Sequence, residues 1–152
     1  MSAETHATAA PAATTTGSPL DHATVGRELP ALDISVTRTL VVAGAVASRD
    51  FEPVHHDHVM AQERGSPDIF VNILTTNGLV GRFVTDWAGP GVRLRRIDIR
   101  LGVPAYPGDT LRLTGEVVEV AGDDGTRRVT VAVRATNARG DHARGTVEVE
   151  RL

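Results

Sequence analysis

The sequence predicts a single α+β domain in which an antiparallel sheet wraps around one long central helix. Residues 69–87 are apolar on nearly every side of a helix, which is typical of a helix buried along its length. Four segments that alternate apolar and polar residues follow it, as expected of strands with one face on a core. Only 3% of the residues are aromatic, so this core consists mainly of Val, Ile, Leu and Ala. The combination is the hotdog architecture.

Two elements are predicted before the long helix. The β-branched, apolar run 34–46 predicts a first, largely buried strand. The segment 48–58 is dense in charge and is interrupted by Pro53, so it predicts a loop. Residues 58–64 are expected to form a short helix that ends at Gly65.

The long helix has clear start and stop signals. Ser66-Pro67-Asp68 supplies a cap, a proline for the first helical position and an acid for the helix dipole. We therefore expect the helix to run from Ile69 to about Trp87. Gly89-Pro90-Gly91 then ends it.

The segments after the helix predict an antiparallel sheet. Alternation marks strands within 97–103, 111–120, 129–133 and 147–149. The phase of the alternation changes at Val118, which indicates a bulge. Turns are predicted at Asp123-Asp124-Gly125 and at Arg139-Gly140-Asp141. Such a sheet has open edges, so we expect two sheets to pair edge to edge in a dimer.

The first residues differ in composition from the rest. Residues 2–19 contain no Ile, Val, Phe or Met, are rich in Ala, Thr and Pro, and have neither the basic start nor the apolar core of a secretory signal. This composition predicts a disordered tail over residues 1–28 and one folded domain over 29–152.

Composition excludes several functions. The chain has no cysteine, and all 16 of its basic residues are arginine, so thiol nucleophiles, disulfides, Schiff bases and P-loop lysines are excluded. A net charge of −3 argues against nucleic-acid binding, and no apolar run approaches the roughly 20 residues of a membrane span. The missing thiols fit a reducing cytoplasm, which is the expected location.

The densest cluster of reactive groups lies in residues 50–58, where Asp and Glu side chains and three histidines gather. A metal site, a solvated loop without a role, and acid–base catalysis are the alternatives. Pro53 makes regular ligand geometry doubtful, and Ser48 lacks the Gly-x-Ser-x-Gly context of a nucleophile. Acid–base chemistry fits better, because a carboxylate and an imidazole that converge on one water can orient it and move its proton. Free amides at the nearby helix start could bind a thioester oxygen.

A resemblance makes this hypothesis specific. Residues 50–57, Asp-Phe-Glu-Pro-Val-His-His-Asp, resemble the hydratase signature Asp-x-Asn-Pro-x-His-x-Asp of MaoC-like (R)-specific enoyl-CoA hydratases. The resemblance implies that Asp50 and His55 are catalytic and that Glu52 and Asp57 support the loop. Glu52 replaces the family's Asn and Arg49 replaces a usual Gly.

The same resemblance implies an oxyanion site at the helix start. Asn72 stands where the family's glycine supplies its amide to the thioester oxygen, and the neighbouring amide of Val71 is a second candidate. No metal or redox cofactor is implied, because coenzyme A arrives as part of the acyl-CoA substrate.

The resemblance extends over about residues 34–120. The stretches 68–74, 84–90 and 100–104 are similar to the small catalytic subunit of actinobacterial steroid side-chain enoyl-CoA hydratases. This implies hydration of a trans-2-enoyl-CoA to the 3-hydroxyacyl-CoA, on a steroid-CoA, in a heterodimer or heterotetramer with a second MaoC-like chain. The alternatives are a homodimeric hydratase for short fatty enoyl-CoAs and a non-catalytic thioester-binding subunit.

Arginines on one predicted strand are candidates for the phosphates of coenzyme A. Arg93, Arg95 and Arg96 carry planar guanidinium groups that suit this contact. The plainer interpretation is that they form an exposed outer face of the sheet, since arginine is usually exposed.

Overall fold

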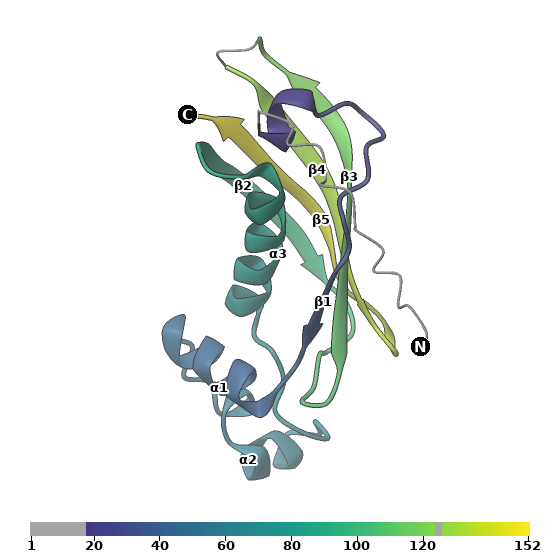
Figure 1. The fold of residues 1–152 in the computed structure, drawn as a ribbon. Coiled ribbons are helices and arrows are strands. Elements are labelled where there is room, and N and C mark those ends of the chain that lie inside the picture. The colour runs from purple at the N-terminus through teal and green to yellow at the C-terminus, as the bar shows by residue number, and fades with distance from the viewer. Residues whose placement is uncertain (1–17, 124–125) are drawn as a thin grey trace, which may run out of the picture.

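The computed structural model describes residues 18–123 and 126–152 and confirms the predicted α+β hotdog architecture. A five-stranded sheet in the order β1-β3-β4-β5-β2 curves around helix α3 (Ile73–Ala88), as Figure 1 shows. All neighbouring strands are antiparallel. The strands are β1 (Leu32–Ser35), β2 (Val92–Leu101), β3 (Thr110–Ala121), β4 (Arg128–Asn137) and β5 (Gly140–Arg151).

The core lies between α3 and the concave face of the sheet. Val80, Phe83 and Val84 of α3 are at most 4% exposed, and they belong to one cluster with the inward-facing residues of β3, β4 and β5. The helix approaches the sheet closely at Gly115, where an added Cβ would lie 3.0 Å from the ring of Phe83. Burial on alternate residues of β3 and β4 is the pattern that the sequence predicted.

The predicted strand at 34–46 was wrong in most of its length. Only β1 is a strand there, and α1 (Arg38–Ala47) follows it. The missed signal is Thr37, whose Oγ1 accepts a hydrogen bond from Leu40 N at 3.0 Å and caps the helix. Packing of Val41 and Ala45 into the core outweighs the preference of β-branched residues for strands.

The predicted start of the long helix was also wrong. Ser66 does not cap a helix, and residues 69–71 are not helical, because Val71 N bonds to Ala105 O and Phe70 N to Val54 O instead. The cap is Asn72, whose Oδ1 accepts from Thr75 N at 2.8 Å. The predicted end is confirmed, since Gly89 adopts a φ of 83° just after Ala88.

The smaller predictions hold where the structure describes them. Helix α2 (His58–Glu63) ends before Gly65 as predicted. The pairing of β3 with β4 shifts between Val117 and Glu119, which confirms the bulge. The turn between β4 and β5 lies at Ala138–Arg139, one residue earlier than predicted, because Gly140 and Asp141 already belong to β5. The predicted turn at Asp123-Asp124-Gly125 falls partly outside the described residues.

Part of the predicted tail belongs to the domain. Residues 18–28 form a short 3-10 helix, η1 (Pro19–His22), and a segment that pairs with β3. Leu20 is fully buried, and Arg127 donates to the carbonyls of Leu20 and Ala23 at 2.9 and 2.6 Å. The boundary at residue 28 was therefore wrong for these residues. Residues 1–17 lie outside the described part of the chain.

Candidate active site

Asp50 and His55 face each other in the loop after α1. Nε2 of His55 lies 3.5 Å from Oδ2 of Asp50, and Nδ1 of the same ring lies 2.8 Å from the carbonyl oxygen of Phe70. A carbonyl oxygen only accepts hydrogen bonds, so Nδ1 carries a hydrogen and Nε2 is the ring nitrogen that faces Asp50. The two side chains are 10% and 25% exposed, so the pair is partly open to solvent.

The chain turns sharply to bring this pair together. Arg49 has a φ of 57° and is the one non-glycine residue of the described chain in the left-handed region, and Asp50 N then bonds back to Ala45 O at 2.9 Å. This conformation explains why glycine is usual here in the family that the loop resembles. Pro53 begins the 3-10 turn η2 (Pro53–His55), which returns His55 toward Asp50.

Asn72 holds the carboxylate in place. Its Nδ2 donates to Oδ2 of Asp50 and to Oγ of Ser48, both at 2.9 Å, while its Oδ1 caps α3. The hydrogen bond from Asn72 is the main reason that the pKa of Asp50 lies below its ordinary value of 3.8; burial opposes this, and Glu52 N and His55 add to it. Asp50 is therefore a carboxylate at neutral pH.

The start of α3 supplies backbone donors beside this pair. Within the described residues, the amides of Asn72, Ile73 and Leu74 have no hydrogen-bond partner, as expected for the first turn of a helix. The amide of Val71 is not available, because it donates to Ala105 O at 3.0 Å. The amide of Asn72 therefore stays a candidate for the thioester oxygen, and the amide of Val71 is occupied.

Sequence reasoning missed what the side chains of Asn72 and Ser48 do. Asn72 was assigned only through its backbone amide, yet its side chain joins α1, α3 and Asp50. The available signal was the strong preference for Asn at helix caps, directly before the apolar run that begins at Ile73. Ser48 Oγ also donates to Gly44 O at 2.7 Å, which ties the cluster to the end of α1.

Glu52 and Asp57 support the loop through different contacts. The backbone amide of Glu52 donates to Oδ1 of Asp50 at 3.4 Å, and its carboxylate pairs with Arg64 of the segment after α2. Oδ1 of Asp57 accepts from Val59 N and Met60 N at 3.0 and 3.1 Å and so caps α2. Both residues fix the loop that carries His55, and neither carboxylate forms a hydrogen bond with Asp50 or His55 among the described residues.

Comparison with protein families matches residues 21–139 to the MaoC like domain. The chain belongs to the MaoC-like family. This MaoC-like chain is 50% identical over 125 residues to the 3-oxo-4,17-pregnadiene-20-carboxyl-CoA hydratase beta subunit of Mycobacterium tuberculosis, which covers 82% of the chain and 94% of that relative.

Solved structures give the same fold. A chain of the ChsH1-ChsH2 complex from Mycobacterium tuberculosis matches with a TM-score of 0.78 and 49% identity, over 85% of the MaoC-like chain and 98% of that chain. The R-hydratase PhaJ1 from Pseudomonas aeruginosa matches with a TM-score of 0.76 over 88% of this chain and 84% of its own. The two sequences are 24% identical, so this match supports the fold alone.

The histidines of the MaoC-like loop do not converge. His56 Nε2 lies 3.2 Å from Phe51 O, and His58 Nδ1 lies 2.9 Å from Oδ1 of Asp68. Across residues 18–123 and 126–152, no three His, Asp or Glu side chains gather as metal ligands. In the same part of the chain, no helix is long and apolar enough to cross a membrane.

The arginines of β2 already have acidic partners. Arg93 and Arg95 lie 3.7 and 3.3 Å from Oε1 of Glu150, and Arg96 lies 2.7 Å from Asp98. All three are exposed, so a contact with coenzyme A stays a prediction that would require these pairs to rearrange.

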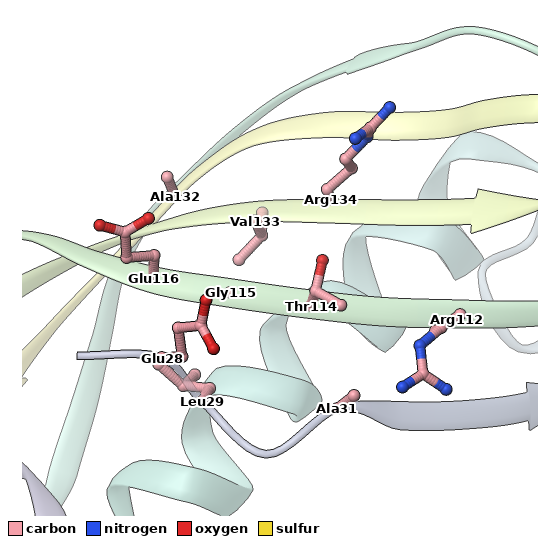
Figure 2. A pocket seen from close by; sticks show the side chains of 10 residues that line it. All are labelled: Glu28, Leu29, Ala31, Arg112, Thr114, Gly115, Glu116, Ala132, Val133 and Arg134. Atoms are coloured by element: carbon pink, nitrogen blue, oxygen red, sulfur yellow. The ribbon is translucent and has the colours of Figure 1, made fainter. Parts of the chain in front are cut away.

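A hollow on the outer face of the sheet lies apart from the Asp50–His55 pair. It has a volume of about 450 Å³ and lies between residues 28–31 and the outward side chains of β3 and β4, as Figure 2 shows. Its arginines are engaged, since Arg112 bonds to Asp33 and Arg134 to Asp141. The hollow contains no histidine and no free helix start, so it lacks the groups for acid–base chemistry.

Proposed function

We propose that this chain hydrates a trans-2-enoyl-CoA to the 3-hydroxyacyl-CoA, with Asp50 and His55 as the catalytic residues. The observation that carries the proposal is the 3.5 Å approach of His55 Nε2 to Asp50 Oδ2, with the ring tautomer set by Phe70 O. A name that includes CoA hydratase on a relative with 50% identity supports it.

The geometry suits addition of water across a polarised double bond. Water held between Asp50 and His55 gives a proton to this pair while its oxygen bonds to the β carbon. Electron density moves to the thioester oxygen, where the free amides at the start of α3 are available as donors. The pair then returns a proton to the α carbon, so one water is consumed and no cofactor takes part. The lowered pKa of Asp50 keeps its side chain ionised and able to accept a hydrogen bond from this water.

The decisive experiment replaces each member of the pair. Asp50→Asn and His55→Ala should each lower kcat by roughly 100- to 10,000-fold, which is the usual contribution of general acid–base catalysis. Loss of the ultraviolet absorbance of the conjugated enoyl thioester measures the reaction. His56→Ala is the matched control, because this neighbouring histidine is exposed and bonds only to Phe51 O. Near-normal rates in both pair variants would sink the proposal and favour a non-catalytic subunit.

We further propose a bulky, apolar acyl group, as in a steroid side-chain enoyl-CoA. The relative from Mycobacterium tuberculosis is named for a pregnadiene-carboxyl-CoA. In this chain, an open groove of about 570 Å³ follows one face of α1, lined by Arg38, Thr39, Val42, Ala43, Val46 and Ala47. Ser48 and Asp50 come directly after this helix in the chain, and Phe51, which follows them, is 64% exposed. Apolar surface of this kind beside a polar pair suits a large hydrophobic substrate.

We also propose a second MaoC-like chain as the partner of this protein. The relative is named as a beta subunit, and the solved match is a chain of a complex. Strand β2 pairs only with β5 among the described strands, and Leu94 and Leu101 on it are 41% and 39% exposed. We propose that the partner extends the sheet along β2. A cytoplasmic location stays a prediction.

Co-expression with candidate MaoC-like chains tests the substrate and the partner together. We expect a heteromer by size-exclusion chromatography that hydrates steroid enoyl-CoA faster than short fatty enoyl-CoA. A homodimer that acts only on short chains would contradict both proposals while leaving the hydratase assignment intact.

A further inference from the structure

A second histidine, His142, is buried at the start of β5 although it lies far from Asp50 in the sequence. It is 2% exposed, and both of its ring nitrogens have partners. Nδ1 lies 2.8 Å from Val103 O and Nε2 lies 2.9 Å from Oγ1 of Thr76 in α3. Val103 O only accepts, so Nδ1 carries a hydrogen, and Nε2 of the neutral ring is an acceptor that shares the single hydroxyl hydrogen of Thr76 with the backbone oxygen of Asn72. Burial lowers the pKa of His142, while the charge of Asp109 and the bond to Val103 act in the opposite direction.

Thr76 connects this histidine to the helix cap. Its side chain is 1% exposed, and Oγ1 lies 3.1 Å from the backbone oxygen of Asn72, which also accepts from Thr76 N at 3.1 Å. The hydroxyl therefore lies between the Nε2 of His142 and the peptide group that joins Asn72 to Ile73. A methyl group could fill this space but could not make either contact.

Asn72 is the residue through which this connection reaches Asp50. It is 2% exposed, its side chain holds Oδ2 of Asp50, and its own peptide groups begin the run of free amides. A small rotation of Asn72 would therefore move the carboxylate and the amides together. Catalytic geometry tolerates little movement of this kind, since a misplacement of 1 Å can cost about 100-fold in rate.

We propose that His142 and Thr76 are positioning residues that fix Asn72, and through it Asp50 and the amides at the start of α3. This inference rests on the proposed hydratase function. It assigns a role to two buried polar residues on α3 and β5 that do not touch the gap between Asp50 and His55. Burying polar side chains costs free energy if any polar atom is left without a partner. If His142 and Thr76 only filled space, two apolar side chains of similar volume would do so without this cost.

Matched variants at Thr76 provide the first test. Thr76→Val keeps the shape and the backbone bond to Asn72 O but removes the hydroxyl, whereas Thr76→Ser keeps the hydroxyl. We expect Thr76→Val to lower kcat on the order of 10-fold with little change in KM, and Thr76→Ser to restore most of the rate. The acid limb of the kcat/KM profile should also move to higher pH in Thr76→Val, because Asn72 no longer holds the Asp50 carboxylate as firmly.

Variants at His142 provide the second test. His142→Asn places a donor near the position of Nδ1 and so keeps the bond to Val103 O, but it is too short to reach Thr76. His142→Gln reaches the position of Nε2. The Asn variant should resemble Thr76→Val, the Gln variant should retain more activity, and the Thr76→Val/His142→Asn double variant should be no slower than either single variant.

A readout without substrate separates this inference from the proposed function. Amide hydrogen exchange at Thr76 and its neighbours in the first turn should accelerate in Thr76→Val and His142→Asn, and not in Thr76→Ser. If the native chain hydrates no enoyl-CoA, the proposed function fails. If it does, and Thr76→Val and His142→Asn keep the native kcat and acid limb, the positioning role is overturned, even where the variants are less stable.

Discussion

At the scale of single residues, Asn72 is the side chain that connects the parts of the site. It caps α3, holds Ser48 and Asp50, and receives the contacts from Thr76. Asp50 and His55 could be found from the sequence because both lie in one short loop. Asn72 and Thr76 are neighbours on α3, but His142 meets Thr76 only through the packing of α3 on β5, so no local pattern could reveal that connection.

Replacing Asn72 by serine separates its two tasks. Serine also caps helices, so Asn72→Ser should leave α3 intact, but the shorter side chain cannot reach Asp50. The pKa of Asp50 should then rise toward its ordinary value, and the acid limb of kcat/KM should move to higher pH. A pH–rate profile with a circular dichroism spectrum checks this, and an unmoved acid limb together with a native spectrum would contradict the role of Asn72.

At the scale of elements, the packing of α1 on α3 sets the position of the catalytic loop. An added Cβ at Gly44 would run into Oγ1 and Cγ2 of Thr75 on α3. Glycine is therefore required here for close approach of two helices, although it lowers helix propensity. No local sequence pattern marks this contact, because the partner Thr75 on α3 is 31 residues away along the chain.

Alanine at two glycines should have opposite effects. Gly44→Ala should destabilise the protein by about 1–3 kcal/mol through overpacking and should lower kcat, because Ser48 and Asp50 follow α1. Gly78→Ala meets nothing within 4 Å in the middle of α3, so it should raise the free energy of unfolding by about 0.4–1 kcal/mol. Chemical denaturation and enoyl-CoA assays of both glycine variants check these two predictions. A stabilising effect of Gly44→Ala would show that α1 does not pack on α3 as described.

Predictions from the sequence are least accurate at the boundaries of helices and strands. The strands of the sheet were predicted well, because alternation repeats over many residues and one face is buried. The start of α3 was predicted at Ser66-Pro67-Asp68, yet Asp68 instead bonds to Arg38 and His58. Those partners lie on other segments, and tertiary contacts of this kind outweigh a local capping signal.

At the scale of the whole molecule, residues 18–28 anchor the chain to the far end of the sheet. Leu20→Ala should lower the free energy of unfolding by about 2–5 kcal/mol, because the side chain is fully buried. The change lies far from Asp50 along the sheet, so kcat at low temperature should stay close to native. Thermal unfolding and rate measurements on the same sample check this, and an unchanged melting temperature would show that this segment does not pack on the domain.

Acid stability should depend on Asp68. Burial acts to raise its pKa, but hydrogen bonds from His58, Ile69 N and Arg38 outweigh it, so the pKa lies below 3.8. A carboxyl whose pKa is lower in the folded state stabilises it above the unfolded pKa, and this contribution disappears as pH falls through the folded pKa. Asp68→Asn should therefore be less stable than native at neutral pH and lose less stability on acidification. Denaturation curves of the native protein and Asp68→Asn from neutral to acidic pH test this prediction. Stability profiles of the two proteins that run parallel over these pH values would contradict it.

Strand β2 has a consequence for how the cell must make this protein. Among the described residues, nothing pairs with its outer edge over residues 92–101, and two half-exposed leucines lie on it. An edge of this length is a template for pairing with any other extended chain, including misassembled copies of itself. Synthesis in excess of the partner should therefore give insoluble material, and matched production of both chains, as from one messenger, should prevent it.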